Sequence, residues 1–107
     1  MTMSDNERPA EAPSEAKRAV VFRMPHGAGS CAFAAIEGNE EVWIKPELVH
    51  RGRLRIGQVV YLTVKNHERG LRAKKVFWTQ HFVSKEDVKG LERAVKAAGR
   101  IGRSVNE

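Results

Sequence analysis

The sequence predicts an all-β domain of five short strands, followed by a single α-helix at the C-terminus. Between residues 19 and 76, five runs of apolar and β-branched residues alternate with turn-forming glycine, proline and asparagine. From residue 84 onward, apolar residues recur at the spacing of an amphipathic helix. We therefore expect a tail at 1–17, a small β-barrel at 18–83 and a helix with its own tail at 84–107. The N-terminal tail mixes proline, alanine, serine and acids without periodicity, which predicts disorder.

Turn residues separate the first three strands. These strands are expected at Ala19–Phe22, Ser30–Ile36 and Glu41–Lys45. The segments between them, 24–29 and 37–40, contain the glycine, proline and asparagine that favour turns. Successive strand residues point to opposite faces, so Val42 and Ile44 should face one way and Trp43 the other.

A short helical turn at Pro46–Val49 and a basic loop at Arg51–Arg55 are expected before the fourth strand. That strand, Gly57–Val64, alternates in two sets, with valine and leucine at 60, 62 and 64 on one face. A polar break at 65–68 leads to the fifth strand, Arg69–Val76. Two of its apolar residues, at 73 and 76, are three positions apart, so a β-bulge is expected between them.

The C-terminal helix has recognisable start and stop signals. Ser84 can cap its N-terminus, and Glu86 and Asp87 suit the positive end of the helix dipole. Gly99 is a plausible C-terminal stop. The apolar positions at helical spacing are Val88, Leu91, Val95 and Ala98. Such a short helix is unstable alone in water, so it should dock on its own barrel, on a second copy or on another protein.

Composition limits the classes of partner and of functional site that the chain can have. The net charge is +6, and residues 19–83 carry ten cations and five anions, which favours a nucleic acid over an anionic membrane as partner. The single cysteine, Cys31, excludes an internal disulfide and a multi-thiolate zinc site, and fits the reducing cytoplasm. The four histidines lack metal-ligand spacing. We expect no metal, no cofactor and no enzymatic activity, since no acid, base and nucleophile share a plausible spacing.

Targeting segments are not expected. The N-terminus is polar and has no apolar core of a signal peptide. No apolar run approaches the roughly 18 residues that a membrane-spanning helix needs. We therefore predict no membrane association and a cytoplasmic location.

Three segments of residues 19–77 follow the order and spacing of a known family. Residues 41–46 (Glu-Val-Trp-Ile-Lys-Pro) stand where that family has Asp-Val-Phe-Val-His-Phe, and residues 54–62 closely match its Leu-x-x-Gly-Gln-x-Val-x-Phe, with Leu62 at the last position. Residues 69–76 match Lys-Gly-Pro-x-Ala-x-x-Val except at the proline, with arginine in place of the lysine. The chain in this region resembles the bacterial cold-shock domain. The resemblance implies a five-stranded Greek-key barrel of the OB type that binds RNA or single-stranded DNA.

The first motif of that family is altered here. Residues 21–31 keep both of its glycines, but three exposed aromatic rings are replaced by Val21, Ala28 and Ser30. By resemblance, Trp43 is the remaining residue that would stack on bases, and Lys45 occupies a histidine position beside it. The alternative is that Trp43 packs beneath the C-terminal helix.

The candidate phosphate contacts are the cations of the basic loop and of the fifth strand. They are Arg51, Arg53, Arg55, Arg69, Arg72, Lys74 and Lys75. If the loop is extended, its three arginines project from one side, and guanidinium groups suit phosphate oxygens. The alternative is a soluble, charged strand edge that resists aggregation.

The favoured function is a non-catalytic protein that binds RNA or single-stranded DNA through a basic barrel surface. The alternative is an OB-fold protein-interaction module that regulates a transcription or translation component. In that case the partner is a protein, bound through the barrel edges and the C-terminal helix.

Overall fold

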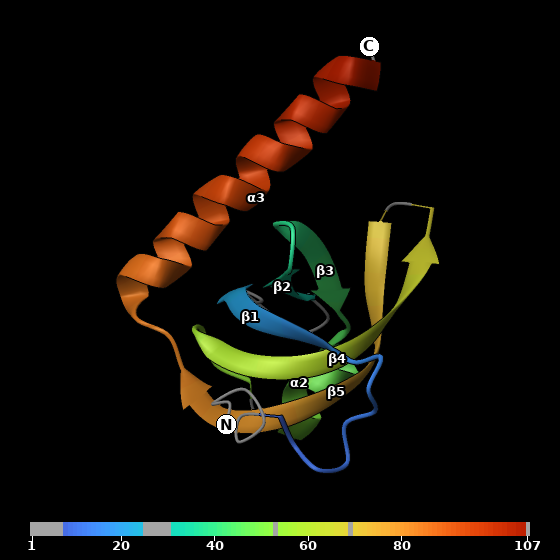
Figure 1. Ribbon diagram of the computed structural model, residues 1–107, viewed down its shortest axis with the longest axis vertical. Coiled ribbons are helices and arrows are strands. Elements are labelled where there is room, and N and C mark those ends of the chain that lie inside the picture. Colours follow the sequence, from blue (N-terminus) through green and yellow to red (C-terminus); the bar gives the residue numbers. More distant parts are fainter. Residues whose placement is uncertain (1–7, 25–30, 53, 69, 107) are drawn as a thin grey trace.

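The computed structural model describes residues 8–24, 31–52, 54–68 and 70–106, with the backbone alone at 50–52 and 99–106. Five strands and two helices follow one another along these residues (Figure 1). They are β1 (Lys17–Arg23), β2 (Ala32–Ile36), β3 (Glu40–Ile44), α2 (Pro46–Gly52), β4 (Gln58–His67), β5 (Gly70–Phe82) and α3 (Lys85–Asn106).

The five strands close into a barrel in the order β1-β2-β3-β5-β4. β3 and β5 run parallel to each other, and the other neighbouring pairs are antiparallel. β4 and β5 form a long hairpin that pairs from Gln58 opposite Phe82 to His67 opposite Gly70. The predicted all-β domain with five strands and a C-terminal helix is therefore confirmed.

Alternation along the strands places the core where the sequence predicts it. Val42 and Ile44 of β3 are fully buried, and so are Val60 and Leu62 of β4. Together with residues of β1, β2 and β5 they form the main apolar cluster inside the barrel. Trp43, on the other face of β3, is only partly buried.

Several predicted boundaries are wrong, and three of them by the widest margin. β5 continues six residues beyond Val76, because residues 77–82 pair with the first residues of β4. Similarly, β4 passes through the expected polar break and ends at His67. α3 runs through Gly99 to Asn106, since a glycine stops a helix only where its backbone leaves the helical conformation.

α3 packs on its own barrel through its first half. Val88 and Val95 are buried in a cluster with Phe22 of β1 and Ala35 of β2, and Leu91 lies against the same cluster. The Ser84 hydroxyl accepts a hydrogen bond from the Asp87 amide (3.1 Å), which confirms the predicted cap. In Figure 1 the helix starts near the end of β5, passes β1 and extends beyond the barrel toward the C-terminus.

Residues 8–16 form turns that lie against the outer face of β4. Ala16 is buried beside Val59 and Tyr61, and the Arg8 guanidinium lies 4.6 Å from the centre of the Tyr61 ring. Both faces of the first half of β4, residues 58–62, are therefore covered. The disorder expected for 1–17 stays a prediction for residues 1–7, which lie outside the described residues, whereas Lys17 already belongs to β1.

Gly57 joins three elements at the start of β4. Its amide donates to the Val21 carbonyl (2.7 Å), and its carbonyl accepts from the Val83 amide (2.8 Å). Its φ is +87°, and a Cβ atom there would lie 3.2 Å from the Val83 carbonyl oxygen and 3.6 Å from a Val88 methyl group.

We expect Gly57→Ala to lower the free energy of unfolding by about 1–3 kcal/mol, because alanine is strained at this φ and crowds the segment leading to α3. Urea denaturation measures the change. Gly38→Ala is the matched control, since Gly38 has a φ of +85° with nothing within 4 Å of the added Cβ. Equal losses in the two variants would show that the close approach at Gly57 contributes nothing.

Candidate nucleic-acid interface

One row of side chains crosses the outer surface of the barrel from strand to strand. Arg23 pairs with Phe33, Phe33 pairs with Trp43, and Trp43 pairs with Arg72. Lys65 of β4 pairs with Arg72 on its other side. Side chains of directly paired residues lie on the same face and close together. These five residues are called the aromatic–cation row below.

The two rings of the row contact each other and are flanked by guanidinium groups. Phe33 and Trp43 meet edge to face, with 5.8 Å between ring centroids and 81° between planes. The Arg72 guanidinium lies 5.7 Å from the Trp43 ring centre, and that of Arg23 lies 6.0 Å from the Phe33 ring centre. Cation–π attraction at these distances holds the rings between two positive groups. The indole nitrogen of Trp43 donates to Glu41 (3.4 Å).

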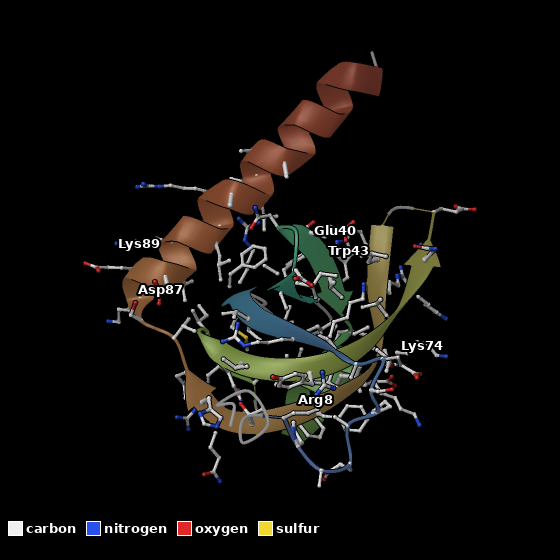
Figure 2. All side chains as sticks on the ribbon, viewed as in Figure 1. Arg8, Glu40, Trp43, Lys74, Asp87 and Lys89 are labelled. Atoms are coloured by element: carbon white, nitrogen blue, oxygen red, sulfur yellow. The ribbon has the colours of Figure 1, made fainter. Side chains whose placement is uncertain are left out.

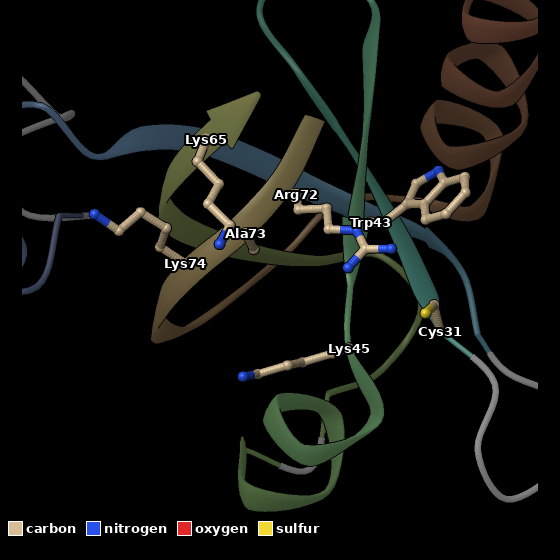
Figure 3. A pocket seen from close by; sticks show the side chains of 7 residues that line it. All are labelled: Cys31, Trp43, Lys45, Lys65, Arg72, Ala73 and Lys74. Carbon is tan, nitrogen blue, oxygen red and sulfur yellow. The ribbon is translucent and has the colours of Figure 1, made fainter. Parts of the chain in front are cut away.

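A groove of about 340 Å³ opens beside Trp43 (Figure 3). It is lined by Cys31, Trp43, Lys45, Lys65, Arg72, Ala73 and Lys74. Four of these residues are cations, and none of the described lining residues is acidic. Like charges gathered around one groove create a positive potential that attracts a polyanion. Lys45, at the edge of the groove, forms an exposed ion pair with Glu47 (3.5 Å).

A β-bulge brings Lys74 to this groove. Lys75 is opposite Thr63 and Ala73 is opposite Val64, so Lys74 is the extra residue of β5. Ala73 and Val76 both remain buried on the inner face. The bulge that the three-residue spacing predicts is thereby confirmed. Bulges redirect side chains, and here the redirected one is a cation.

The first half of α3 reaches the β1 end of the row. Arg23 donates to the Glu92 carboxylate at 2.8 Å. This hydrogen bond holds the pKa of the Glu92 carboxyl below its usual range, and the charges of Arg23 and Lys96 act in the same direction, while partial desolvation opposes them. The carboxylate is therefore ionised at neutral pH.

The structure brings together only some of the residues proposed from the sequence. Trp43, Lys45, Arg72 and Lys74 line the groove. Lys75 does not line the groove; it lines a second hollow of about 630 Å³, whose lining also includes Glu11, Glu15 and Lys74.

The basic loop is not one extended segment. Arg51 lies in the last turn of α2, so the alternation expected over 51–55 is wrong at its start. Arg55 is exposed and its amide donates to Gln58 at the beginning of β4. Lys65, which lines the groove, lies further along the same strand. From Gln58 to Lys65 the strand extends about 23 Å, at about 3.3 Å per residue. Arg53 and Arg69 lie outside the described residues.

Sequence reasoning missed three members of the row. Phe33 stands between Ala32 and Ala34, and this alternation marks it as the outward residue of its strand. The sequence pattern places Lys65 in a polar break, whereas it continues β4. Arg23 is the last residue of β1. Their alignment depends on the pairing register, which no local pattern reveals.

Trp43 is placed beside the helix cluster rather than within it. The aromatic residues in that cluster are Phe22, which is buried, and Phe33, which packs at its edge. Trp43 meets the cluster through its edge-to-face contact with Phe33. In Figure 2, Trp43 is labelled beside β3, and Lys89 lies on the side of α3 away from the barrel. The indole lines the positive groove and is only partly buried.

Among the described residues, no three histidine, cysteine or acidic side chains gather in a way that would hold a metal ion. No helix in the described part of the chain has the length and apolar character needed to cross a membrane. Comparison with protein-family models, curated proteins and solved structures gives no match for this chain.

Proposed function

We propose that this chain is a non-catalytic protein that binds single-stranded nucleic acid, RNA or DNA, across the aromatic–cation row. The observation that carries the proposal is the alignment of two partly exposed rings with three cations over consecutive strands, beside a groove lined by further lysines. Rings of this kind stack on unpaired bases, and cations beside them neutralise the phosphates.

The strand order supports a barrel of the OB type, the finer description that the sequence resemblance implies. Such barrels have five strands in a Greek-key arrangement, and many bind oligonucleotides on the face of strands 2 and 3. Phe33 of β2 and Trp43 of β3 lie on that face here. A fold alone does not assign a function, and the side chains of the row are what support binding here.

The proposal favours an unpaired strand over a duplex. In a duplex the bases are stacked on one another, and their flat faces are not available to Phe33 or Trp43. The groove cations would contact either form through phosphate. A preference for single strands therefore distinguishes stacking from simple charge attraction.

A salt titration tests the proposal. If Lys45, Lys65, Arg72 and Lys74 each contact a phosphate, the logarithm of affinity should fall with the logarithm of salt concentration with a slope near −3, at about −0.7 per contact. Anisotropy of a labelled oligothymidylate of about 12 nucleotides measures it. The double variant Arg72→Ala, Lys74→Ala should reduce the slope by about 1.4.

The matched control is the double variant Lys85→Ala, Lys89→Ala, which removes the same charge from exposed positions of α3. It should leave the slope nearly unchanged. An affinity independent of salt, or no binding at about 50 mM salt, would contradict the proposal. That result would favour the alternative of a protein-interaction module.

A further inference from the structure

Arg23, the cation at one end of the aromatic–cation row, forms an ion pair with the Glu92 carboxylate of the same chain. Arg23 Nη2 and Glu92 Oε2 are 2.8 Å apart, with 42% and 33% of the two side chains exposed. The same guanidinium lies 6.0 Å from the centre of the Phe33 ring. A base stacked on Phe33 would bring its phosphate close to Arg23, where the Glu92 carboxylate already lies.

We propose that Glu92 competes with phosphate for Arg23, so that α3 restrains nucleic-acid binding at the β1 end of the row. This inference rests on the proposed function and concerns the regulation of the same site. Arginine has five N–H donors, so the geometry of Arg23 leaves donors for a second anion. However, the phosphate and the carboxylate would then be neighbouring negative charges, and their repulsion opposes simultaneous binding.

The competition has a distinctive effect on salt dependence. When a phosphate replaces Glu92, Arg23 exchanges one anion for another. The phosphate releases a counterion, but the freed carboxylate attracts one, so this contact adds nothing to the net release of counterions. Without the Glu92 charge, Arg23 becomes a full phosphate contact. Removal of the carboxylate charge should therefore increase both the affinity and the number of phosphate contacts that the salt slope reports.

The position of α3 does not depend on Glu92 alone. Val88 and Val95 remain buried against Phe22 and Ala35 whichever anion Arg23 binds. Exposed ion pairs contribute little to stability. A variant that removes the Glu92 charge should therefore keep the fold, as circular dichroism and thermal melting can verify.

The experiment compares Glu92→Gln with Glu86→Gln in the full chain. Glu86 is exposed in the first turn of α3, so its substitution changes the net charge equally at another place. With the same oligothymidylate at about 50 mM salt, Glu92→Gln should bind about three- to tenfold more tightly than the wild type. Its salt slope should be steeper by about 0.7. Glu86→Gln should match the wild type in both measurements.

An Arg23→Ala background completes the test. There the Glu92→Gln substitution should no longer change affinity, because the group under competition is absent. The inference is overturned if Glu92→Gln binds no more tightly than the wild type, or if Glu86→Gln gains as much. If neither the wild type nor Glu92→Gln binds the oligonucleotide, the proposed function itself fails. Binding by Glu92→Gln alone would support the competition in its strongest form.

Discussion

Replacing both Phe33 and Trp43 with alanine should weaken the binding of a single strand by about 2–6 kcal/mol, since each base–ring stack contributes about 1–3 kcal/mol. The two rings are in contact on the outer surface of β2 and β3 and are only partly buried. Titration of a labelled oligonucleotide against wild type and variant measures the loss. Quenching of Trp43 fluorescence, in a background with Trp78→Phe, reports the stacking directly.

Phe33 also packs at the edge of the cluster beneath α3, so its loss affects stability as well. Phe33→Leu is the appropriate control, because leucine retains apolar packing but offers no ring to a base. It should lose affinity while melting close to the wild type. If the double alanine variant keeps its affinity, or if its lost affinity merely follows partial unfolding, the rings do not form a binding surface.

Ile44→Ala should affect stability instead of binding, and should destabilise the fold by about 2–5 kcal/mol because it leaves a cavity in a closely packed core. Ile44 is fully buried inside the barrel, next to Trp43 in sequence but on the other face of β3. Urea denaturation measures the change in the free energy of unfolding.

Lys45→Ala, at the following position, is the control. Lys45 is exposed and pairs weakly with Glu47, so its replacement should change stability by no more than about 0.5 kcal/mol. Where the Ile44 variant is still folded, its affinity for oligonucleotide should equal that of the wild type. An Ile44 variant as stable as the Lys45 variant would mean that the alternation of β3 has been assigned to the wrong faces.

The sequence was informative where a local rule decides the structure. Alternation assigned both faces of β3, and the spacing of Ala73 and Val76 predicted the bulge that presents Lys74. Ser84 was recognisable as a cap because its side chain bonds to a nearby amide. Each of these features depends on a few neighbouring residues.

The site itself could not be predicted in the same way. The members of the aromatic–cation row are separated by between seven and forty-nine positions, and only the pairing register aligns them. The arginines at 51, 53 and 55 are close in sequence and alternate, yet α2 includes the first of them. The contact of Glu92 with Arg23 likewise depends on where α3 docks.

The near-perpendicular arrangement of Phe33 and Trp43 has a consequence for the ligand. Two successive bases that each lay flat on one of these rings would have planes inclined to each other by close to the 81° between the rings. A strand with strongly stacked adenines resists such a bend, because its neighbouring bases must separate and tilt. A pyrimidine strand, with weak stacking and a flexible backbone, adopts it more readily. The barrel would then select a strand by its flexibility, without hydrogen bonds to the edge of any base.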